Sequence, residues 1–240
     1  MAIHLRQICL VAEALAPAVD DLARGLCLSP CYVDPHVAEF GLKNTLLRAG
    51  SQFLEVVAPT GPGTAAGRQL ARRGGDGGYM VICQADTRAE QTALRARAAD
   101  LGVRVAFEVD RGAWNIMQLH PGDMGAAFLE VDWDEAADPT GNWHPAGGLD
   151  WQRAPAGNAI IAAATLQHPD PGALAARWAA VLGLPVTDRG DIHTIALANA
   201  DLHFMPDTDG RGAGLGGITL SGATKNLPTT LCGTRFTARP

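Results

Sequence analysis

The tetrapeptide Phe53-Leu54-Glu55-Val56 returns 75 residues later as Phe128-Leu129-Glu130-Val131. The surroundings of the two copies agree as well. A short apolar run with strand character (residues 7–11 and 79–83) lies upstream of each copy, followed by an Ala- and Leu-rich stretch with helical spacing (17–26 and 88–101). This repeat predicts that the first half of the chain is one supersecondary unit written twice.

Three short extended runs follow each expected helix. They are residues 31–33, 40–47 and 52–57 in the first unit, and residues 103–109, 115–119 and 126–131 in the second. Gly50-Ser51 and Pro121-Gly122-Asp123 supply turn residues between the last two runs of each set. The order strand, helix, strand, strand, strand predicts an α+β fold of repeated βαβββ modules.

A third copy is expected after a Pro-, Gly- and Trp-rich join. It has a strand at 163–167, a helix at 171–182, a hairpin at 192–197 and 202–205, and a last strand at 217–220. We therefore divide the chain into a first module (1–75), a second module (76–136), a linker (137–157) and a third, degenerate module (158–240). The linker should pack on the protein, because Trp143 and Trp151 would be costly to leave in water.

Aligning the third copy with the first tests whether it repeats the Glu. The helix ends align at an offset of 156 residues, which makes Ala163 the equivalent of Gln7. The alignment of the hairpins makes Phe204 the equivalent of Glu55. Neither Ala nor Phe can ligate a metal, so we expect no metal half-site in the third module.

Composition excludes several classes of partner. Apolar residues make up 47% of the 240 residues, and the net charge is −6 without a long basic stripe. A nucleic-acid partner is therefore not expected, and neither is an anionic membrane. No apolar stretch reaches the roughly 20 residues of a membrane span, and residues 1–11 do not read as a signal peptide. We expect a cytoplasmic protein, and the abundance of Ala and Gly with only two Lys is typical of a high-GC bacterial source.

Each of the two repeated Glu is expected to share a strand face with an aromatic residue. By strand alternation, Phe53 shares a face with Glu55, and Phe128 shares a face with Glu130. A carboxylate beside aromatic rings is expensive to bury unless it is paired, liganded or protonated. Either these Glu lie on a solvated sheet face or are neutralised by Arg, or both line one cavity.

The tandem βαβββ pattern with Glu on each last strand resembles the vicinal-oxygen-chelate superfamily, which includes glyoxalases, bleomycin-resistance proteins and dioxygenases. In that superfamily two modules pack so that their curved mixed sheets enclose a cavity. The second module is most similar to the methylmalonyl-CoA epimerase branch, through its glycine-rich lead at 74–78 and its His120-Pro121 pair. The strings Phe40-Gly41-Leu42 and Gly77-Gly78-Tyr79-Met80 resemble the glyoxalase-like group of the superfamily.

The resemblance implies a set of site residues. The metal-ligand positions of the superfamily fall on Gln7, Glu55, Tyr79 and Glu130, and Tyr79 stands where the superfamily usually has His. Glu55 and Glu130 would also serve as catalytic carboxylates, and the ligand pocket would contain Phe53, Tyr79, His120 and Phe128. An all-oxygen donor set favours Mg or Mn over softer metals, or it binds no metal at all.

Two functions remain open on these grounds. One is a metal-dependent lyase, isomerase or dioxygenase that chelates a small oxygenated molecule and moves a proton. The alternative is a non-catalytic, antibiotic-type binder of a small molecule, without metal.

An odd number of modules also leaves one apolar sheet face without a partner. This face carries Ile161, Ala163, Ile195 and Leu197. It predicts either a homodimer formed through the third modules or a third module docked on the first two.

Overall fold

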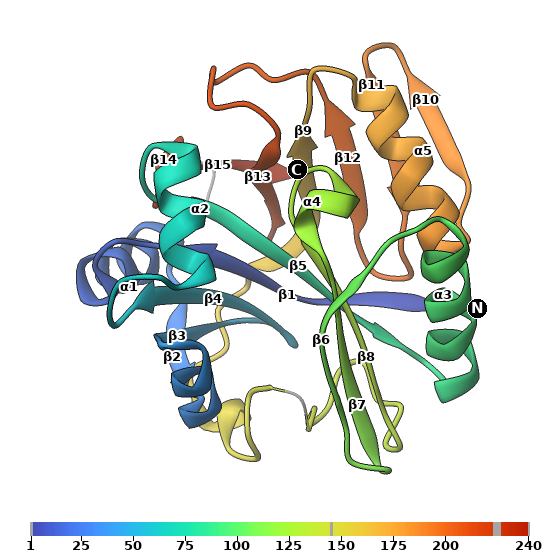
Figure 1. Ribbon diagram of the computed structural model, residues 1–240. Helices are drawn as coiled ribbons and strands as arrows, with labels where there is room; N and C mark the ends of the chain where they lie inside the picture. The colour runs from blue at the N-terminus through green and yellow to red at the C-terminus, as the bar shows by residue number, and fades with distance from the viewer. Residues whose placement is uncertain (1, 145, 223–226, 240) are drawn as a thin grey trace.

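Two mixed β-sheets organise the chain in the computed structural model, which describes residues 2–144, 146–222 and 227–239 (Figure 1). The first sheet has eight strands in the order β2-β3-β4-β1-β5-β8-β7-β6, and the second has seven in the order β10-β11-β12-β9-β13-β15-β14. The strands of the first sheet are β1 (Ile3–Val11), β2 (Ser29–Tyr32), β3 (Leu42–Ala49), β4 (Gln52–Pro59), β5 (Gly77–Ala85), β6 (Val105–Asp110), β7 (Trp114–Leu119) and β8 (Phe128–Asp134). Those of the second are β9 (Ile160–Gln167), β10 (Val186–Arg189), β11 (Ile192–Ala196), β12 (Asp201–Met205), β13 (Gly214–Ser221), β14 (Thr230–Leu231) and β15 (Thr234–Arg239).

The helices connect and cover these strands. They are α1 (Leu15–Leu26), α2 (Ala65–Arg73), α3 (Arg88–Asp100), α4 (Pro121–Met124) and α5 (Pro171–Leu182), with short 3-10 helices η1 (Pro35–Phe40) and η2 (Trp151–Arg153). Buried Val19, Leu22 and Leu26 lie along one side of α1, as the helical spacing predicts. Helix α3 begins with a capping box, in which Thr87 and Glu90 satisfy each other's backbone N–H groups.

The first sheet confirms the predicted α+β fold of repeated βαβββ modules. Strand β1 runs parallel to β4, β5 runs parallel to β8, and β1 pairs with β5 in antiparallel fashion at the centre. The predicted start of the strand at residues 40–47 is wrong. Residues 35–40 form η1, capped by the Asp34 side chain, and Gly41 ends it with a φ of 68°, so the next strand begins only at Leu42.

The second sheet repeats the same plan and corrects the prediction for residues 217–220. These residues belong to β13, which runs antiparallel to β9 and parallel to β15. In the first sheet β5 has these same relations to β1 and β8. Strand β13 therefore begins a shortened fourth unit and is not the last strand of the third. The second strand of the third unit is β10, for which the sequence predicted no strand.

The strand register also corrects the predicted equivalent of Glu55. Cys9 pairs with Glu55 across β1 and β4, whereas Thr165, the residue 156 positions after Cys9, pairs with His203 across β9 and β12. His203, and not Phe204, thus stands in the place of Glu55. The hairpin is one residue shorter than the alignment assumed, and a shift of one residue exchanges the two faces of a strand. Phe204 points to the opposite face, where its ring packs on Trp178 with centroids 5.8 Å apart.

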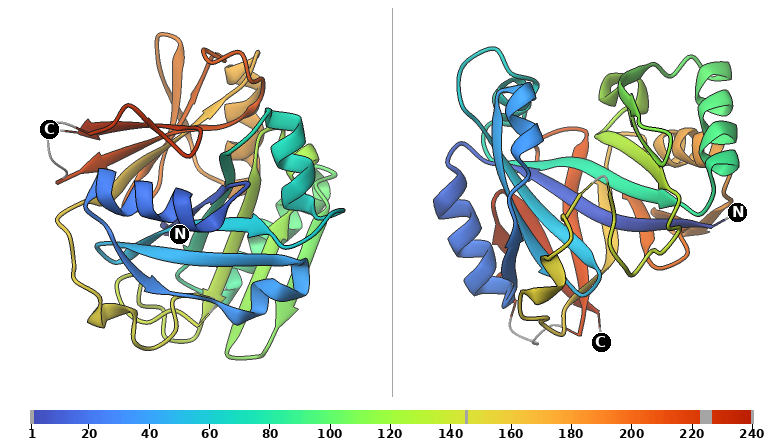
Figure 2. Two further views of the ribbon diagram at one scale, coloured as in Figure 1. Left: turned by 90° about the vertical axis from the view of Figure 1, so that its left-hand side faces the viewer. Right: turned by 90° about the horizontal axis from the view of Figure 1, so that it is seen from below.

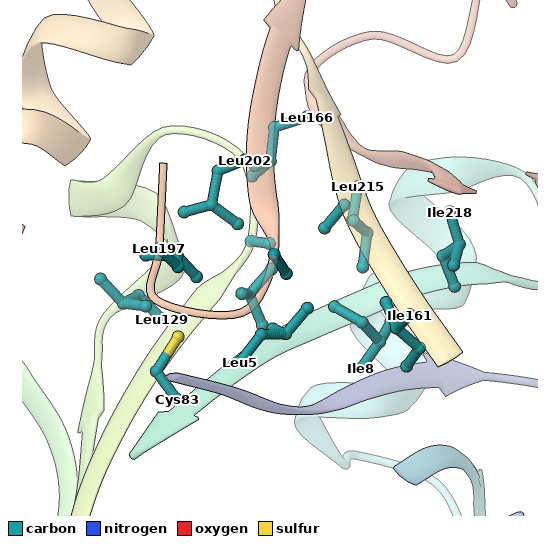
Figure 3. Packing of buried hydrophobic residues seen from close by; sticks show 14 of the residues in the cluster. Leu5, Ile8, Cys83, Leu129, Ile161, Leu166, Leu197, Leu202, Leu215 and Ile218 are labelled. Atoms are coloured by element: carbon teal, nitrogen blue, oxygen red, sulfur yellow. The ribbon is translucent and has the colours of Figure 1, made fainter. Parts of the chain in front are cut away.

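The backs of the two sheets pack against each other in one core that also takes in α1, α3 and α5. Figure 3 shows this core, with Leu5 and Ile8 of the first sheet beside Ile161 and Leu215 of the second. The approach is close enough that a Cβ on Gly78 would lie 2.3 Å from the Leu215 carbonyl oxygen, which requires glycine there.

This packing shows what covers the apolar sheet face that the odd number of predicted modules left without a partner. Ile161, Ile195 and Leu197 are buried in the shared core, so the third unit docks on the first two, as one of the two alternatives predicted. Ala163 is also buried but lies outside that core cluster. Within the described residues, no helix is long and apolar enough to cross a membrane.

Candidate active site

The two repeated carboxylates lie on the face of the first sheet that is turned away from the shared core. Because the linker covers this face, we call it the first inner face. Gln7 on β1 lies opposite Phe53 on β4 and opposite Ile82 on β5, and Ile82 lies opposite Glu130 on β8. Phe53 and Ile82 belong to the second buried cluster, separate from the core between the sheets. The structure therefore brings Gln7, Phe53 and Glu130 onto one surface.

Glu55 is held on this face by two amide groups. Gln7 Nε2 donates to Glu55 Oε2 at 2.8 Å, and Asn44 Nδ2 donates to Glu55 Oε1 at 2.6 Å. Asn44 cannot turn its amide over, because its Oδ1 accepts the Asp34 backbone N–H at 3.0 Å. Burial raises the pKa of the Glu55 carboxyl, while hydrogen bonds from Asn44, Cys9 and Gln7 oppose that rise.

Glu130 lies within electrostatic reach of Glu55 but has a different set of partners. Gln118 Nε2 donates to Glu130 Oε2 at 2.7 Å, and the Asp132 carboxyl shares a hydrogen bond with it. Burial, together with the negative charge of Glu55, raises the pKa of Glu130 to about 7. The pKa of Asp132 is raised well above its ordinary value, by burial first and then by Glu130, so Asp132 keeps the shared proton near neutral pH.

Tyr79 and Phe128 complete the aromatic part of this face. Their rings meet edge to face, with centroids 5.2 Å apart. Burial raises the pKa of the Tyr79 phenol above its ordinary value, and the neighbouring Cys9 and Glu55 raise it further, so the group is a neutral hydroxyl at physiological pH.

His120 is placed differently from the other expected pocket residues. It caps the start of α4, where its Nδ1 accepts the Gly122 backbone N–H at 3.2 Å and lies 3.2 Å from an Arg104 nitrogen. Among the described residues, its hydrogen bonds join it to Arg104 and to the first turn of α4, and none joins it to the two repeated Glu.

The linker covers the first inner face (Figure 2). Trp143 and Trp151 are each only 1% exposed and belong to the same cluster as Phe53 and Tyr79, which confirms that the linker packs on the protein. The Trp151 ring meets Phe53 edge to face, with centroids 5.1 Å apart.

Two arginines of the first sheet fasten this linker. Arg48 donates to the Gln152 and Ala154 carbonyl oxygens at 2.7 and 2.6 Å. The fully buried Arg6 donates to the Asp138 and Gly141 carbonyl oxygens at 2.8 and 3.0 Å. The linker is thus tied down at both ends.

Several buried polar atoms beneath the linker have no hydrogen-bond partner among the described residues. They are Arg6 Nε, Gln7 Oε1, Trp143 Nε1 and Trp151 Nε1. Native proteins leave few buried polar groups unpaired, so a cluster of them indicates a place for a polar ligand or for water. Donors and acceptors are both represented, as a small oxygenated molecule would require.

The predicted metal ligands do not fit Mg or Mn in this arrangement. Asn44 presents its N–H₂, and not its carbonyl oxygen, to one oxygen of Glu55, and Gln7 does the same to the other. Tyr79 is a neutral phenol, a weak ligand for a hard cation. Among the described residues, no group of three or more His, Cys, Asp and Glu side chains is arranged to hold a metal ion.

The polar neighbours of the two Glu are not among the site residues predicted from the sequence. Asp132 and Asp134 continue the face of Glu130 along β8, and Asp134 accepts backbone N–H groups from the linker residues Ala137 and His144 at 3.1 and 3.4 Å. The sequence contains a pattern that predicts the two Asp residues, because acidic residues at the alternating positions 130, 132 and 134 of one strand share a face. Asn44, by contrast, comes from a neighbouring strand, and no local pattern marks it.

Comparison with known families agrees with the topology and with the repeat. The family described as the glyoxalase-like domain matches residues 8–182. The chain belongs to this family, and with it to the vicinal-oxygen-chelate superfamily. A search of curated proteins matched none.

Among solved structures, a hypothetical protein from Staphylococcus aureus is similar over 100% of both chains, at 12% identity and a TM-score of 0.68. A methylmalonyl-CoA epimerase from Streptomyces coelicolor, solved with 2-nitronate-propionyl-CoA, covers 56% of this chain and 99% of its own, at 22% identity and a TM-score of 0.48. At these identities, the likeness to the Staphylococcus protein shows the fold alone, here over the whole chain.

Proposed function

We propose that this glyoxalase-like protein is a lyase or isomerase that binds a small oxygenated molecule between the first inner face and the linker, and that Glu130 transfers the proton. The placement of Glu130 carries the proposal: its carboxyl is buried on the first inner face, accepts a hydrogen bond from Gln118 Nε2 at 2.7 Å and lies near the charge of Glu55. This environment raises its pKa to about 7. A carboxyl group with this pKa is half ionised near neutral pH, and it can therefore both accept and return a proton there.

The step follows from the groups on this face. The ionised Glu130 removes a proton from a carbon beside a carbonyl group; the electron pair of the C–H bond forms a C=C bond, and the π pair of the carbonyl group moves onto its oxygen to give an enolate. Protonated Glu130 then returns the proton to the same or an adjacent atom, or the enolate expels a leaving group. Trp143 and Trp151 contribute buried N–H groups that have no hydrogen-bond partner among the described residues, and such donors suit a developing oxyanion.

Glu55 has a positioning role in this proposal. Its oxygens are occupied by Gln7 and Asn44, and its negative charge raises the pKa of Glu130. Because the metal ligands do not fit, the proposed chemistry is carried by the side chains alone.

A non-catalytic binder is the second candidate function, favoured by the depth of the site. Glu55 and Glu130 are each only 6% exposed, and the linker would have to lift for a ligand to enter.

A cytoplasmic location and a homodimer remain predictions from the sequence.

Proton exchange with solvent tests the proposal. In D₂O, wild-type protein should remove the α-proton NMR signal from at least one member of a panel of hydroxy ketones, 2-oxo acids and α-substituted thioesters. Glu130→Gln should slow that exchange about 100-fold or more, the usual contribution of a general base. Glu135→Gln, an exposed carboxylate just beyond β8, is the matched control and should exchange at the wild-type rate.

Two results would decide against the enzyme. Equal rates for wild type and Glu130→Gln with every panel member would remove Glu130 from the chemistry. Saturable binding of a panel member without any exchange would favour the binder.

A further inference from the structure

The inner face of the second sheet, which is turned away from the shared core, holds a cavity of about 820 Å³. Its walls come from β9, β10, β11, β12, β13 and β15 of the second sheet. The volume lies within the usual range for small-molecule sites. No described residue of the linker (137–157), which covers the first inner face, lines this cavity.

This cavity stands in the place of the candidate active site but has the opposite chemistry. Strand register puts His203 where the first sheet has Glu55, and Thr237 where it has Glu130. The two carboxylates are therefore absent from the second site. It cannot carry out the proton transfer proposed for the first, and it calls for a different ligand.

The charge of the cavity is positive. It contains three arginines and one carboxylate, and that carboxylate, Asp201, is already paired with Arg239 at 2.8 Å. Among the described residues, the Arg235 side chain donates to Thr208 Oγ1 and Met205 Sδ, at 3.4 and 3.7 Å, and neither Arg235 nor Arg189 has an acidic partner. His203 adds little charge near neutral pH, because burial lowers its pKa.

These two guanidinium groups, which have no acidic partner among the described residues, come from opposite sides of the sheet. Arg189 lies on the edge strand β10, and Arg235 lies on β15, on the far side of the central pair β9 and β13. Both line the same cavity, with the hydroxyls of Thr165 and Thr194 and the side chain of Met205 in its wall. The site therefore presents two separate cationic groups with a mixed polar and apolar surface between them.

We propose that this cavity binds a small dicarboxylate, with one carboxylate on Arg235 and the other on Arg189. The planar guanidinium fork matches a carboxylate with two parallel hydrogen bonds, and pairs of this kind are among the stronger polar contacts in proteins. A short aliphatic chain between the two carboxylates would contact Met205, and the threonine hydroxyls would bind carboxylate oxygens. The site is separate from the first inner face and does not depend on the function proposed there.

Titration of the full-length protein with glutarate tests the proposal. Calorimetry should give saturable binding at millimolar or lower concentration, weakened by added KCl. Arg189→Gln and Arg235→Gln should each weaken glutarate binding about 10-fold or more, because each removes one charged pair. Butyrate, which keeps one carboxylate, should bind as weakly to wild type as glutarate binds to either variant.

The matched control is Arg24→Gln, an exposed arginine of α1 that should leave glutarate binding unchanged. Thermal unfolding of each variant should resemble that of wild type, which excludes misfolding as the cause of lost binding. Phosphate binding as tightly as glutarate would overturn the two-ended site. Unaltered glutarate binding by both arginine variants would place its site elsewhere. A dimer that is lost in Arg235→Gln would assign this face to a second copy of the chain.

Discussion

Glu130 and Asp132 lie two residues apart on β8 and share one hydrogen bond under full burial. Both groups have pKa values raised above those expected in an unfolded chain, so both favour the protonated form in the folded protein. Their stabilising contribution is therefore complete below about pH 4.5, the ordinary pKa of Glu, and is lost as the pH rises toward about 7, the folded value for Glu130.

The free energy of unfolding should accordingly fall between pH 5 and pH 7, by up to about 1.4 kcal/mol per pH unit for each such group. Glu130→Gln should flatten the slope, because the amide does not titrate. Urea unfolding at several pH values measures this, with Glu135→Gln as the control that keeps the wild-type slope. An identical slope in Glu130→Gln would mean that Glu130 ionises normally in the fold.

Glu55 allows a separate test of whether the site takes a metal. Because Asn44 and Gln7 donate to both of its oxygens, we expect Mn or Mg at millimolar concentration to leave the melting temperature unchanged. Asn44→Asp replaces a donor with a second carboxylate and should create some metal-dependent stabilisation. A metal-induced rise in melting temperature for wild type, lost in Glu55→Gln, would restore the four-ligand site that the sequence resemblance implies.

At the level of elements, the linker is the part that sequence reasoning described least. Trp143 and Trp151 predicted packing, but nothing local in the sequence says which surface they cover. That surface is set by side chains from distant strands, among them Arg48 and Arg6, which bind linker carbonyl groups. The repeat, by contrast, predicted most strands of the first sheet, because it compares two independent copies of one pattern.

Gly148 provides a test of the linker as a cover. Its φ is 61°, and a Cβ there would lie 2.6 Å from the Tyr32 ring, so Gly148→Ala should push the linker outward. We expect a loss of about 1–3 kcal/mol, the usual cost of overpacking, and greater quenching of tryptophan fluorescence by acrylamide. Gly63→Ala is the matched control, since Gly63 also has a positive φ, 82°, but has no atom within 4 Å of its added Cβ. Equal losses for the two variants would attribute the effect to backbone strain alone.

For the whole molecule, the sequence shows three units where the structure has four, one of them shortened. The fourth escapes detection because Gly216 and Thr237 stand where the second unit has Tyr79 and Glu130. Its presence gives the third unit a neighbouring strand, and the backs of the two sheets then bury each other. This packing within one chain removes the reason that the odd module count gave for a homodimer.

A shared core predicts that the two sheets unfold together. Leu215 on β13 is fully buried between them, so Leu215→Ala should cost about 2–5 kcal/mol through lost burial and the cavity left behind. Because that cavity borders both sheets, hydrogen exchange of the central strands β1 and β9 should accelerate by the same factor, in a single cooperative transition. Val33→Ala, at a position 62% exposed, should change neither stability nor exchange. If exchange accelerated in β9 while β1 kept its protection, the two sheets would be separate folding units that merely touch.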